Sequence, residues 1–333
     1  MASTFITDLQ KKIRNLPTII FPEADEEKIL RAARRAYDQK ICRPILLGQP
    51  DVLAELAGKL YLSLDRLVIM DYTNPAVIAS TIEAYLGVSQ DFSQKALQRK
   101  TKDPLNFAAM LVRLDVADSM IAGLRYTTGE VILASQAFIG MQEGISTVSS
   151  LGILDVPGFQ GAQGEYLVIA DCAVNAFPTP NERADIAIAT ADTIHKLMGW
   201  EPRVALLAYS TKGSAEHEKL QEITETLRIV RERRPDIAID GEFQLDAAIV
   251  PAVAAKKVKV DSEVAGRANI VIFPDLNAGN IGVKLVQIFA NASAHGPLLQ
   301  GFAKPVSDMS RSAPVEEILG GITMLSVLAQ RMP

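Results

Sequence analysis

Short apolar runs alternate with amphipathic stretches along most of the chain. Residues 18–21, TIIF, form a β-rich run, and the stretch 25–40 that follows repeats apolar residues at helical spacing. The same order returns with the run 43–48 and the helical stretch 51–60. Alternation of this kind is typical of a mostly parallel sheet with helices on both faces, so the pattern predicts an α/β fold.

Later segments continue this pattern. Asp103 is the predicted N-cap of a helix at 104–115, because Pro104 suits the first helical position. Further strands are predicted at 66–72, 118–123, 203–209, 237–241 and 268–275, and further helices from about 180, around 217–234 and at 283–293.

Residues 144–170 interrupt the alternation. Two β-rich runs, 144–156 and 165–171, flank the turn-rich connector PGFQGAQG, which predicts a β-hairpin. The chain has 333 residues, more than one hydrophobic core usually serves, so two domains are expected. We place the boundary near 143, just before the hairpin.

Composition indicates an ordinary soluble globular protein, with 48% apolar and 22% charged residues. A net charge of −5 disfavours nucleic acid as a partner. The two cysteines are expected to be free thiols, since disulfide scaffolds are richer in cysteine. The N-terminus lacks a signal-peptide core and no run reaches about 18 apolar residues, so we expect a cytoplasmic protein without membrane contact.

Motifs for metals and common cofactors are missing. The histidines, His195, His217 and His295, are scattered, and no HExxH, CxxC or EF-hand spacing occurs, so no metal site is expected. Gly158, Gly161 and Gly164 form GxxGxxG, which is not the dinucleotide fingerprint, and a P-loop motif is also lacking.

Polar loops follow several predicted strands, where open α/β sheets bind ligands. These loops are 124–130, 209–214 and 273–282, and in the last of them Asn277, Gly279 and Asn280 would offer amide groups to an anion. One such loop alone is better explained as a turn that caps a helix. Together they favour a cleft for a small anionic or phosphorylated ligand.

The stretch SDMSRSAPVEE, residues 307–317, gathers Asp308, Ser310, Arg311, Glu316 and Glu317 just before the last apolar run. Acidic residues are common in the first turn of a helix, so the residues alone leave two readings open, a solvated loop or a reactive site.

Four segments resemble the phosphate acetyl/butyryl transferases, which move an acyl group between acyl phosphate and coenzyme A. They are STKGS, DGEFQLDAAIVP, FPDLNAGNIG and KPVSDMSR, and the resemblance extends over essentially the whole chain. It implies two three-layer α/β/α domains that flank a cleft, as in isocitrate and isopropylmalate dehydrogenases. The implied domains are 1–143 with 300–333, which carries the catalytic C-terminal segment, and 144–299.

The same resemblance implies reversible transfer between acetyl phosphate and coenzyme A by direct thiolate attack in a ternary complex. Coenzyme A would be a substrate, no cofactor would be bound permanently, and the active form would be a homodimer. Ser310, Arg311 and Glu317 match the family's catalytic positions. Arg311 would hold the phosphate oxygens, Ser310 would stabilise the carbonyl oxygen, and Glu317 would take the thiol proton.

Residues expected to bind substrate come from the retained motifs and loops. They are Arg99, Thr127, Thr128, Ser210, Thr211, Lys212, Asn277, Gly279, Asn280 and Lys304.

Three departures from the family pattern keep alternatives open. Glu317 replaces the usual aspartate, Leu133 stands where the family has an arginine that contacts coenzyme A, and Ser312–Pro314 differ from the family's loop. The alternatives are a preference for propanoyl or butanoyl groups, or a non-catalytic relative that binds coenzyme A or an acyl phosphate. A decarboxylating dehydrogenase of similar architecture would need a cluster of aspartates for a metal, which the sequence does not clearly contain.

Overall fold

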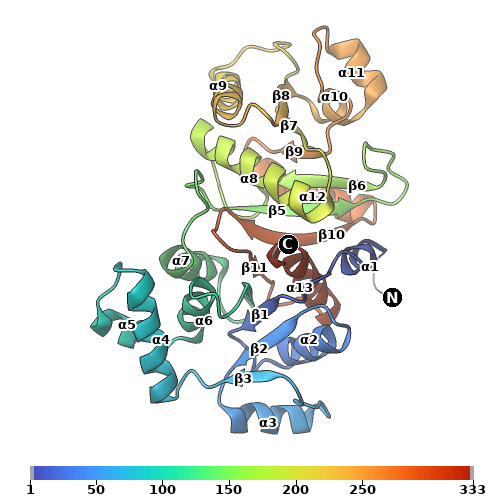
Figure 1. The fold of residues 1–333 in the computed structure, drawn as a ribbon. Coiled ribbons are helices and arrows are strands. Elements are labelled where there is room, and N and C mark those ends of the chain that lie inside the picture. The colour runs from blue at the N-terminus through green and yellow to red at the C-terminus, as the bar shows by residue number, and fades with distance from the viewer. Residues whose placement is uncertain (1–3, 331–333) are drawn as a thin grey trace. The chain divides into compact units, whose positions relative to one another are not determined.

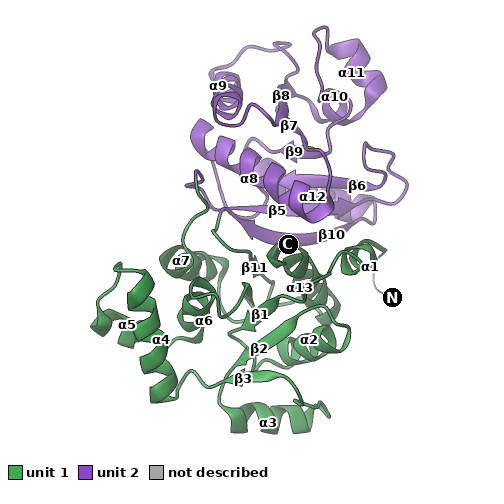
Figure 2. Ribbon diagram, in the orientation of Figure 1, with its two compact units in different colours: residues 1–143, 302–333 green, residues 144–301 purple. Residues whose placement is uncertain are grey.

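The computed structural model describes residues 4–330, and the chain divides into two compact units (Figures 1 and 2). Unit 1 contains residues 1–143 and 302–333, and unit 2 contains residues 144–301. That these units are two separate domains with the predicted roles stays a prediction.

Unit 1 contains a parallel sheet in the order β3-β2-β1-β4-β11. Its strands are β1 (Thr18–Phe21), β2 (Arg43–Leu47), β3 (Val68–Met70), β4 (Ser119–Ala122) and β11 (Val306–Asp308). Its helices are α1 (Thr4–Gln10), α2 (Glu27–Asp38), α3 (Pro50–Lys59), α4 (Pro75–Val88), α5 (Gln94–Lys100), α6 (Pro104–Arg113), α7 (Thr128–Phe138) and α13 (Val315–Ala329).

Helices cover both faces of this sheet, as Figure 1 shows, with α2 and α13 packed together on one face and α6 and α7 on the other. The central strands are therefore buried on both sides, and Ile19, Ile20 and Phe21 are all fully buried. This explains why β1 is a continuous apolar run and not an alternating one.

Unit 2 contains a mixed sheet in the order β10-β5-β6-β9-β7-β8. Its strands are β5 (Ser149–Asp155), β6 (Tyr166–Ala170), β7 (Arg203–Leu207), β8 (Ala238–Phe243), β9 (Ile270–Ile272) and β10 (Ser293–Gln300). Its helices are α8 (Pro180–Met198), α9 (Glu218–Arg233), α10 (Leu245–Ile249), α11 (Pro251–Lys257) and α12 (Leu276–Phe289).

The hairpin predicted from the sequence is confirmed, because β5 and β6 pair in antiparallel fashion. Strand β10 also pairs antiparallel with β5, whereas β6, β9, β7 and β8 are parallel. Helix α8 packs against the strands of this sheet. Both of its ends are capped, because Thr179 forms a capping box with Glu182 and Gly199 ends the helix with φ 71°. The predicted α/β class is confirmed.

One prediction about the C-terminal third had the wrong bounds, and two strands there were not predicted. Helix α12 spans Leu276–Phe289 and not 283–293, because Asp275 caps it by accepting a hydrogen bond from the Ala278 N–H. Gly279, which made this stretch look like a loop, allows the helix to approach the chain after β6, since a Cβ there would lie 2.4 Å from the Asp171 carbonyl oxygen.

Strands β10 and β11 were not predicted. Strand β10 contains Gly296 and Pro297, two residues that argue against a strand, and β11 has only three residues. Both are recognised only through their pairing with β5 and β4.

The predicted cap at Asp103 is confirmed, because its carboxylate accepts hydrogen bonds from the Leu105 and Asn106 N–H groups at 2.8 and 3.1 Å. We expect Asp103→Ala to destabilise unit 1 by about 1 kcal/mol, since two helical donors lose their partner. The urea midpoint should fall for Asp103→Ala and much less for Asp103→Asn, which keeps an acceptor. Tyr126→Phe controls for the contact between the Tyr126 hydroxyl and Asp103 at 3.4 Å. Equal losses in the alanine and asparagine variants would contradict the capping role.

Candidate active site

The loops that follow β1, β4 and β11 lie together at the carboxyl edge of the unit 1 sheet. Strand β4 lies between β1 and β11, and all three strands run parallel. The three strands therefore end at the same edge of the sheet, which is the edge where open α/β sheets bind ligands.

Glu23, just beyond β1, shapes the loop that follows β4. Its side chain is 1% exposed, yet its carboxylate accepts hydrogen bonds from four successive backbone N–H groups. The donors are Gly123, Leu124, Arg125 and Tyr126, at 2.5–3.2 Å. Sequence reasoning missed Glu23, although a carboxylate directly after an apolar strand was an available signal.

Asp308, the last residue of β11, lies against the loop after β4. The Thr128 hydroxyl donates a hydrogen bond to its Oδ2 at 2.5 Å, and its buried Oδ1 has no hydrogen-bond partner among residues 4–330. Gly123 permits this approach, since its φ is +117° and a Cβ there would lie 2.3 Å from the Asp308 Oδ1 atom. Burial, and to a lesser extent the charge of Glu23, raises the pKa of Asp308 to about 6 despite the Thr128 hydrogen bond.

Ser310 and Arg311 are exposed in the loop between β11 and α13. The loop is anchored at its start by the Met309 N–H, which donates to the Ala122 carbonyl at 2.8 Å, and further on by the buried Ala313. The hydroxyls of Ser310 and Ser312 lie 2.9 Å apart. Ser310 and Arg311, two of the three predicted catalytic residues, therefore project from a short loop whose two ends are fixed.

Glu316 and Glu317 open helix α13, and both residues are exposed. Glu316 pairs with Arg35 at 2.8 Å, and this hydrogen bond lowers its pKa. Desolvation instead raises the pKa of Glu317. A carboxylate with a raised pKa accepts a thiol proton more readily, so this shift agrees with the predicted role of Glu317, which stays a prediction.

Thr127 and Thr128, predicted to bind substrate, begin helix α7. Thr127 forms a capping box with Glu130, and Thr128 bonds to Asp308. Leu133, at the family's arginine position, lies on the same helix with 67% of its surface exposed. The guanidinium of Arg125 cannot readily replace that arginine, because it pairs with Asp25 and Glu26 at 2.7 and 2.5 Å.

The structure does not bring every predicted residue of unit 1 to this edge. Arg99 lies exposed in the last turn of α5. The Lys304 ammonium, which lies before β11, contacts the Val112 carbonyl oxygen and Asp115 at 2.5 and 2.8 Å. Because Lys304 precedes its strand, it lies toward the amino edge of the sheet, away from the Ser310 loop.

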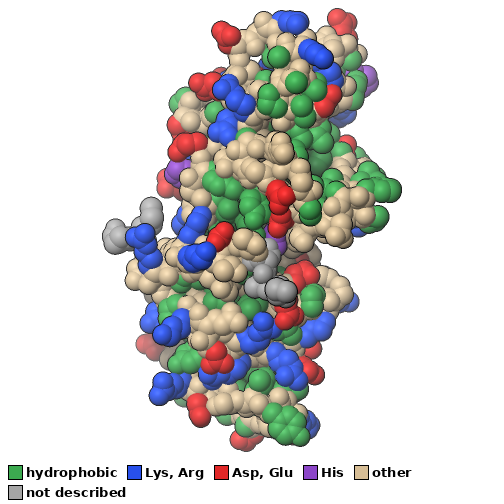
Figure 3. Space-filling model, turned by 90° about the vertical axis from the view of Figure 1, so that its right-hand side faces the viewer, with side chains coloured by type: hydrophobic (Ala, Val, Ile, Leu, Met, Phe, Trp, Pro, Cys, Tyr) green, Lys and Arg blue, Asp and Glu red, His purple; other side chains and the backbone are tan. Residues whose placement is uncertain are grey.

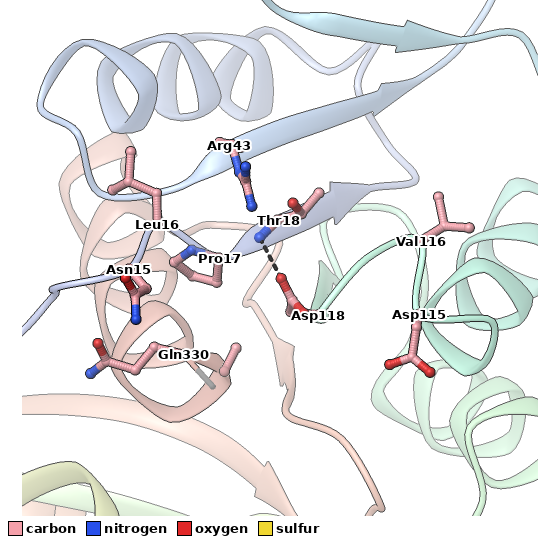
Figure 4. Close-up of a pocket in the computed structure, with 10 residues that line it drawn as sticks. Asn15, Leu16, Pro17, Thr18, Arg43, Asp115, Val116, Asp118 and Gln330 are labelled. Carbon is pink, nitrogen blue, oxygen red and sulfur yellow. Dashed lines mark hydrogen bonds between the residues drawn. The ribbon is translucent and has the colours of Figure 1, made fainter. Parts of the chain in front are cut away.

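A cavity of about 400 Å³ also lies at that amino edge, lined by residues at the starts of β1, β2 and β4 (Figure 4). Within it the Thr18 N–H donates to Asp118 at 2.8 Å, a hydrogen bond drawn as a dashed line. None of the predicted site residues lines this cavity.

In unit 2, Ser210, Thr211 and Lys212 follow β7 and are held by internal contacts. The Ser210 hydroxyl donates to Glu242 at 2.9 Å, and the Lys212 ammonium pairs with Asp240 at 2.5 Å. The Thr211 hydroxyl accepts a hydrogen bond from the Gln244 N–H at 3.0 Å. Their predicted contact with substrate stays a prediction.

Asn277 and Asn280 are exposed in the first turns of α12, whereas Gly279 is buried. The Asn280 amide donates to the Cys172 carbonyl at 3.2 Å, in the loop that follows β6. The buried Asp171 accepts hydrogen bonds from three successive N–H groups of that loop, those of Ala173, Val174 and Asn175.

Within residues 4–330, no three His, Cys, Asp or Glu side chains gather in a way that could hold a metal ion. The helices of the same residues are all too short or too polar to cross a bilayer. Cys42 and Cys172 are free thiols, and burial raises the pKa of Cys172 to about 11.

Comparison with known proteins identifies the family. Residues 4–325 match the sequence model of the phosphate acetyl/butaryl transferases. A phosphate acetyltransferase of Clostridium acetobutylicum is 39% identical over 322 residues, 94% of each chain, and one from Bacillus subtilis is 36% identical over 320 residues, 96% of each chain. The chain belongs to this family and is an enzyme of the acyltransferase class, as predicted.

Solved structures agree. A phosphotransacetylase from Streptococcus pyogenes matches with a TM-score of 0.91 and 34% identity, over 99% of each chain. The EutD phosphotransacetylase from Staphylococcus aureus matches with a TM-score of 0.87 and 29% identity, over 98% of this chain and 99% of that one. A 4-hydroxythreonine-4-phosphate dehydrogenase from Burkholderia phymatum, 13% identical over 96% of this chain and all of that one, has a TM-score of 0.57 and shows the fold alone.

The buried position of Asp308 predicts how the free energy of unfolding depends on pH. Its carboxyl binds more protons in the folded than in the unfolded state between its ordinary pKa of 3.8 and about 6, so its ionisation destabilises the fold as pH rises through that range. We expect the free energy of unfolding of Asp308→Asn, relative to wild type, to increase by about 2 kcal/mol from pH 4.5 to 7.5 in urea titrations. The comparison with wild type cancels the titration of other groups.

Thr128→Val is the matched variant. It removes the hydroxyl that stabilises the ionised form of Asp308, so its stability should fall more steeply than that of wild type over the same pH range. A constant difference between Asp308→Asn and wild type at both pH values would contradict the raised pKa.

Proposed function

We propose that this protein catalyses the reversible transfer of an acetyl group between acetyl phosphate and coenzyme A. The observation that carries the proposal is the loop of Ser310 and Arg311, with Glu317 in the adjoining helix turn, at the carboxyl edge of the unit 1 sheet in a chain of this family. Coenzyme A is a substrate in this scheme, and no permanently bound cofactor takes part.

The proposed reaction is a single displacement. Glu317 takes the proton from the thiol of coenzyme A, and the thiolate attacks the carbonyl carbon of acetyl phosphate. The Ser310 hydroxyl donates a hydrogen bond to the carbonyl oxygen as negative charge develops there. The carbon–oxygen bond to phosphate then breaks, and Arg311 balances the charge of the departing inorganic phosphate.

The raised pKa of Glu317 supports its role as the base, because a carboxylate of higher pKa accepts a thiol proton more readily. Exposure of Ser310 and Arg311 supports their access to substrate. Thr127 and Thr128 contribute to the site by setting the start of α7, whereas the internal contacts of Lys304 argue against a direct role for it.

The exposed Leu133 leaves open a different substrate preference. Without the family's arginine, coenzyme A loses a cationic contact, which would weaken its binding without affecting the loop of Ser310. A preference for propanoyl or butanoyl phosphate is the corresponding alternative.

Arg311→Ala tests the proposal. Thioester formation from coenzyme A and acetyl phosphate should fall about 100-fold or more, because the phosphate loses its bidentate partner. Arg35→Ala, which removes a nearby arginine paired with Glu316, should retain most of the activity. Parallel assays with propanoyl and butanoyl phosphate rank the acyl groups. Binding of coenzyme A without turnover of any of the three acyl phosphates would overturn the enzymatic proposal.

We also propose that the protein forms a homodimer through helix α12. Ile281, Leu285, Ile288 and Phe289 recur at helical spacing and are 57%, 49%, 74% and 83% exposed. Figure 3 shows apolar side chains in patches on the upper part of one face, which belongs to unit 2. A second copy is the occupant we favour, because the same apolar stripe on two chains is self-complementary about a twofold axis.

Sedimentation of the wild type should give about twice the chain mass of 36.0 kDa. The double variant with Ile288→Asp and Phe289→Asp should sediment with the mass of one chain. Tyr61→Asp changes an apolar side chain that is 97% exposed in unit 1 and should leave the dimer intact. A dimer that survives the double substitution would place the interface elsewhere, and a monomeric wild type would refute the proposal.

A further inference from the structure

The charges around the Ser310 loop are unevenly partnered. Most of the carboxylates near this loop already form an ion pair with an arginine or accept hydrogen bonds. Asp25 and Glu26 pair with Arg125, Glu27 pairs with Arg31 at 2.9 Å, Glu316 pairs with Arg35 at 2.8 Å, and one oxygen of Glu130 accepts hydrogen bonds from the N–H and hydroxyl of Thr127.

Two cations near these carboxylates have no ion-pair partner among the described residues, although the pKa of Glu130, lowered mainly by the hydrogen bonds from Thr127, is also lowered by the charge of Arg311. Neither Lys28 nor Arg311 forms an ion pair with any carboxylate of residues 4–330. Lys28 lies in the first turn of α2, and its ammonium donates to the Arg311 carbonyl at 3.5 Å. An ammonium carries three N–H donors, so this long contact leaves donors for a ligand.

Lys28 is held in place by its neighbours. Its side chain is half-buried, and it is followed by Ile29 and Leu30, which are completely buried. Helix α2 packs against α13, the helix that begins just after the Ser310 loop. The backbone that carries Lys28 is therefore fixed to the same scaffold as the Arg311 loop, although the two residues are far apart in sequence.

We propose that Lys28 is a second anion-binding residue, which holds the phosphoryl oxygens of acetyl phosphate, or the product phosphate, together with Arg311. This inference rests on the proposed function. A dianionic phosphoryl group has three oxygens to satisfy, and Arg311 alone can grip two of them in its planar fork. Lys28 supplies a point charge and a donor for the third. The two cations make the loop selective for the anionic end of the substrate.

Steady-state kinetics separate this role from a merely structural one. In Lys28→Ala the KM for acetyl phosphate should rise about five- to tenfold, as expected for one charge-assisted hydrogen bond at a half-buried site, while the KM for coenzyme A changes less than about twofold. Lys28→Arg should recover most of the loss. Lys59→Ala, which removes the same charge from α3 where Lys59 pairs with Glu55, should leave both constants unchanged.

Calorimetric titration with inorganic phosphate provides a readout that does not depend on turnover. Wild type should bind phosphate more tightly than Lys28→Ala by about the same factor, and added salt should reduce the difference. Equal phosphate affinity and an equal KM for acetyl phosphate in wild type and Lys28→Ala would overturn the proposal for Lys28, even if Arg311→Ala abolishes activity. If wild type shows no turnover, the proposed function fails, but weaker phosphate binding by Lys28→Ala would still support Lys28 as an anion-binding residue.

Discussion

Buried carboxylates fix the loops at the strand ends of this protein. They do so by accepting hydrogen bonds from backbone N–H groups of those loops. Burying a carboxylate is costly unless several donors surround it, and Glu23 meets four in succession after β4. Asp171 does the same for the loop after β6, and Glu242 binds both the Ser210 hydroxyl and the Gly213 N–H after β7. Each carboxylate therefore fixes the backbone of a loop at a strand end.

The same principle sets the electrostatics of the candidate active site. Glu23 holds the loop after β4, Gly123 in that loop leaves room for Asp308, and Asp308 bonds to Thr128 at the start of α7. The Ser310 loop begins directly after this cluster. Because the surrounding acids are mostly paired or hydrogen-bonded, the exposed end of the loop keeps the charges of Lys28 and Arg311 for an incoming anion.

Much of the fold could be predicted because its signals are local. The apolar run of β1, the Asp103–Pro104 start of α6 and the turn-rich connector of the β5–β6 hairpin each lie within a few residues. Errors arose where partners are distant in sequence. Strand β11 has three residues and is defined by β4, and Gly279 looks like a loop residue until it packs against Asp171. The Asp275 cap of α12 is a local signal that sequence reasoning missed.

The α/β class, the hairpin, the family and the segment with Ser310, Arg311 and Glu317 could be predicted from the sequence, because periodicity and ordered motifs are properties of neighbouring residues. The folded chain was needed to show that Glu23 and Asp308 organise the start of this segment, that Lys304 contacts other partners, and that Lys28 lies beside Arg311. These relations join residues about a hundred or more positions apart, and no local pattern encodes them. They arise when parallel strands are aligned in a sheet, which brings the carboxyl ends of β1, β4 and β11 to one edge and Lys304 to the other.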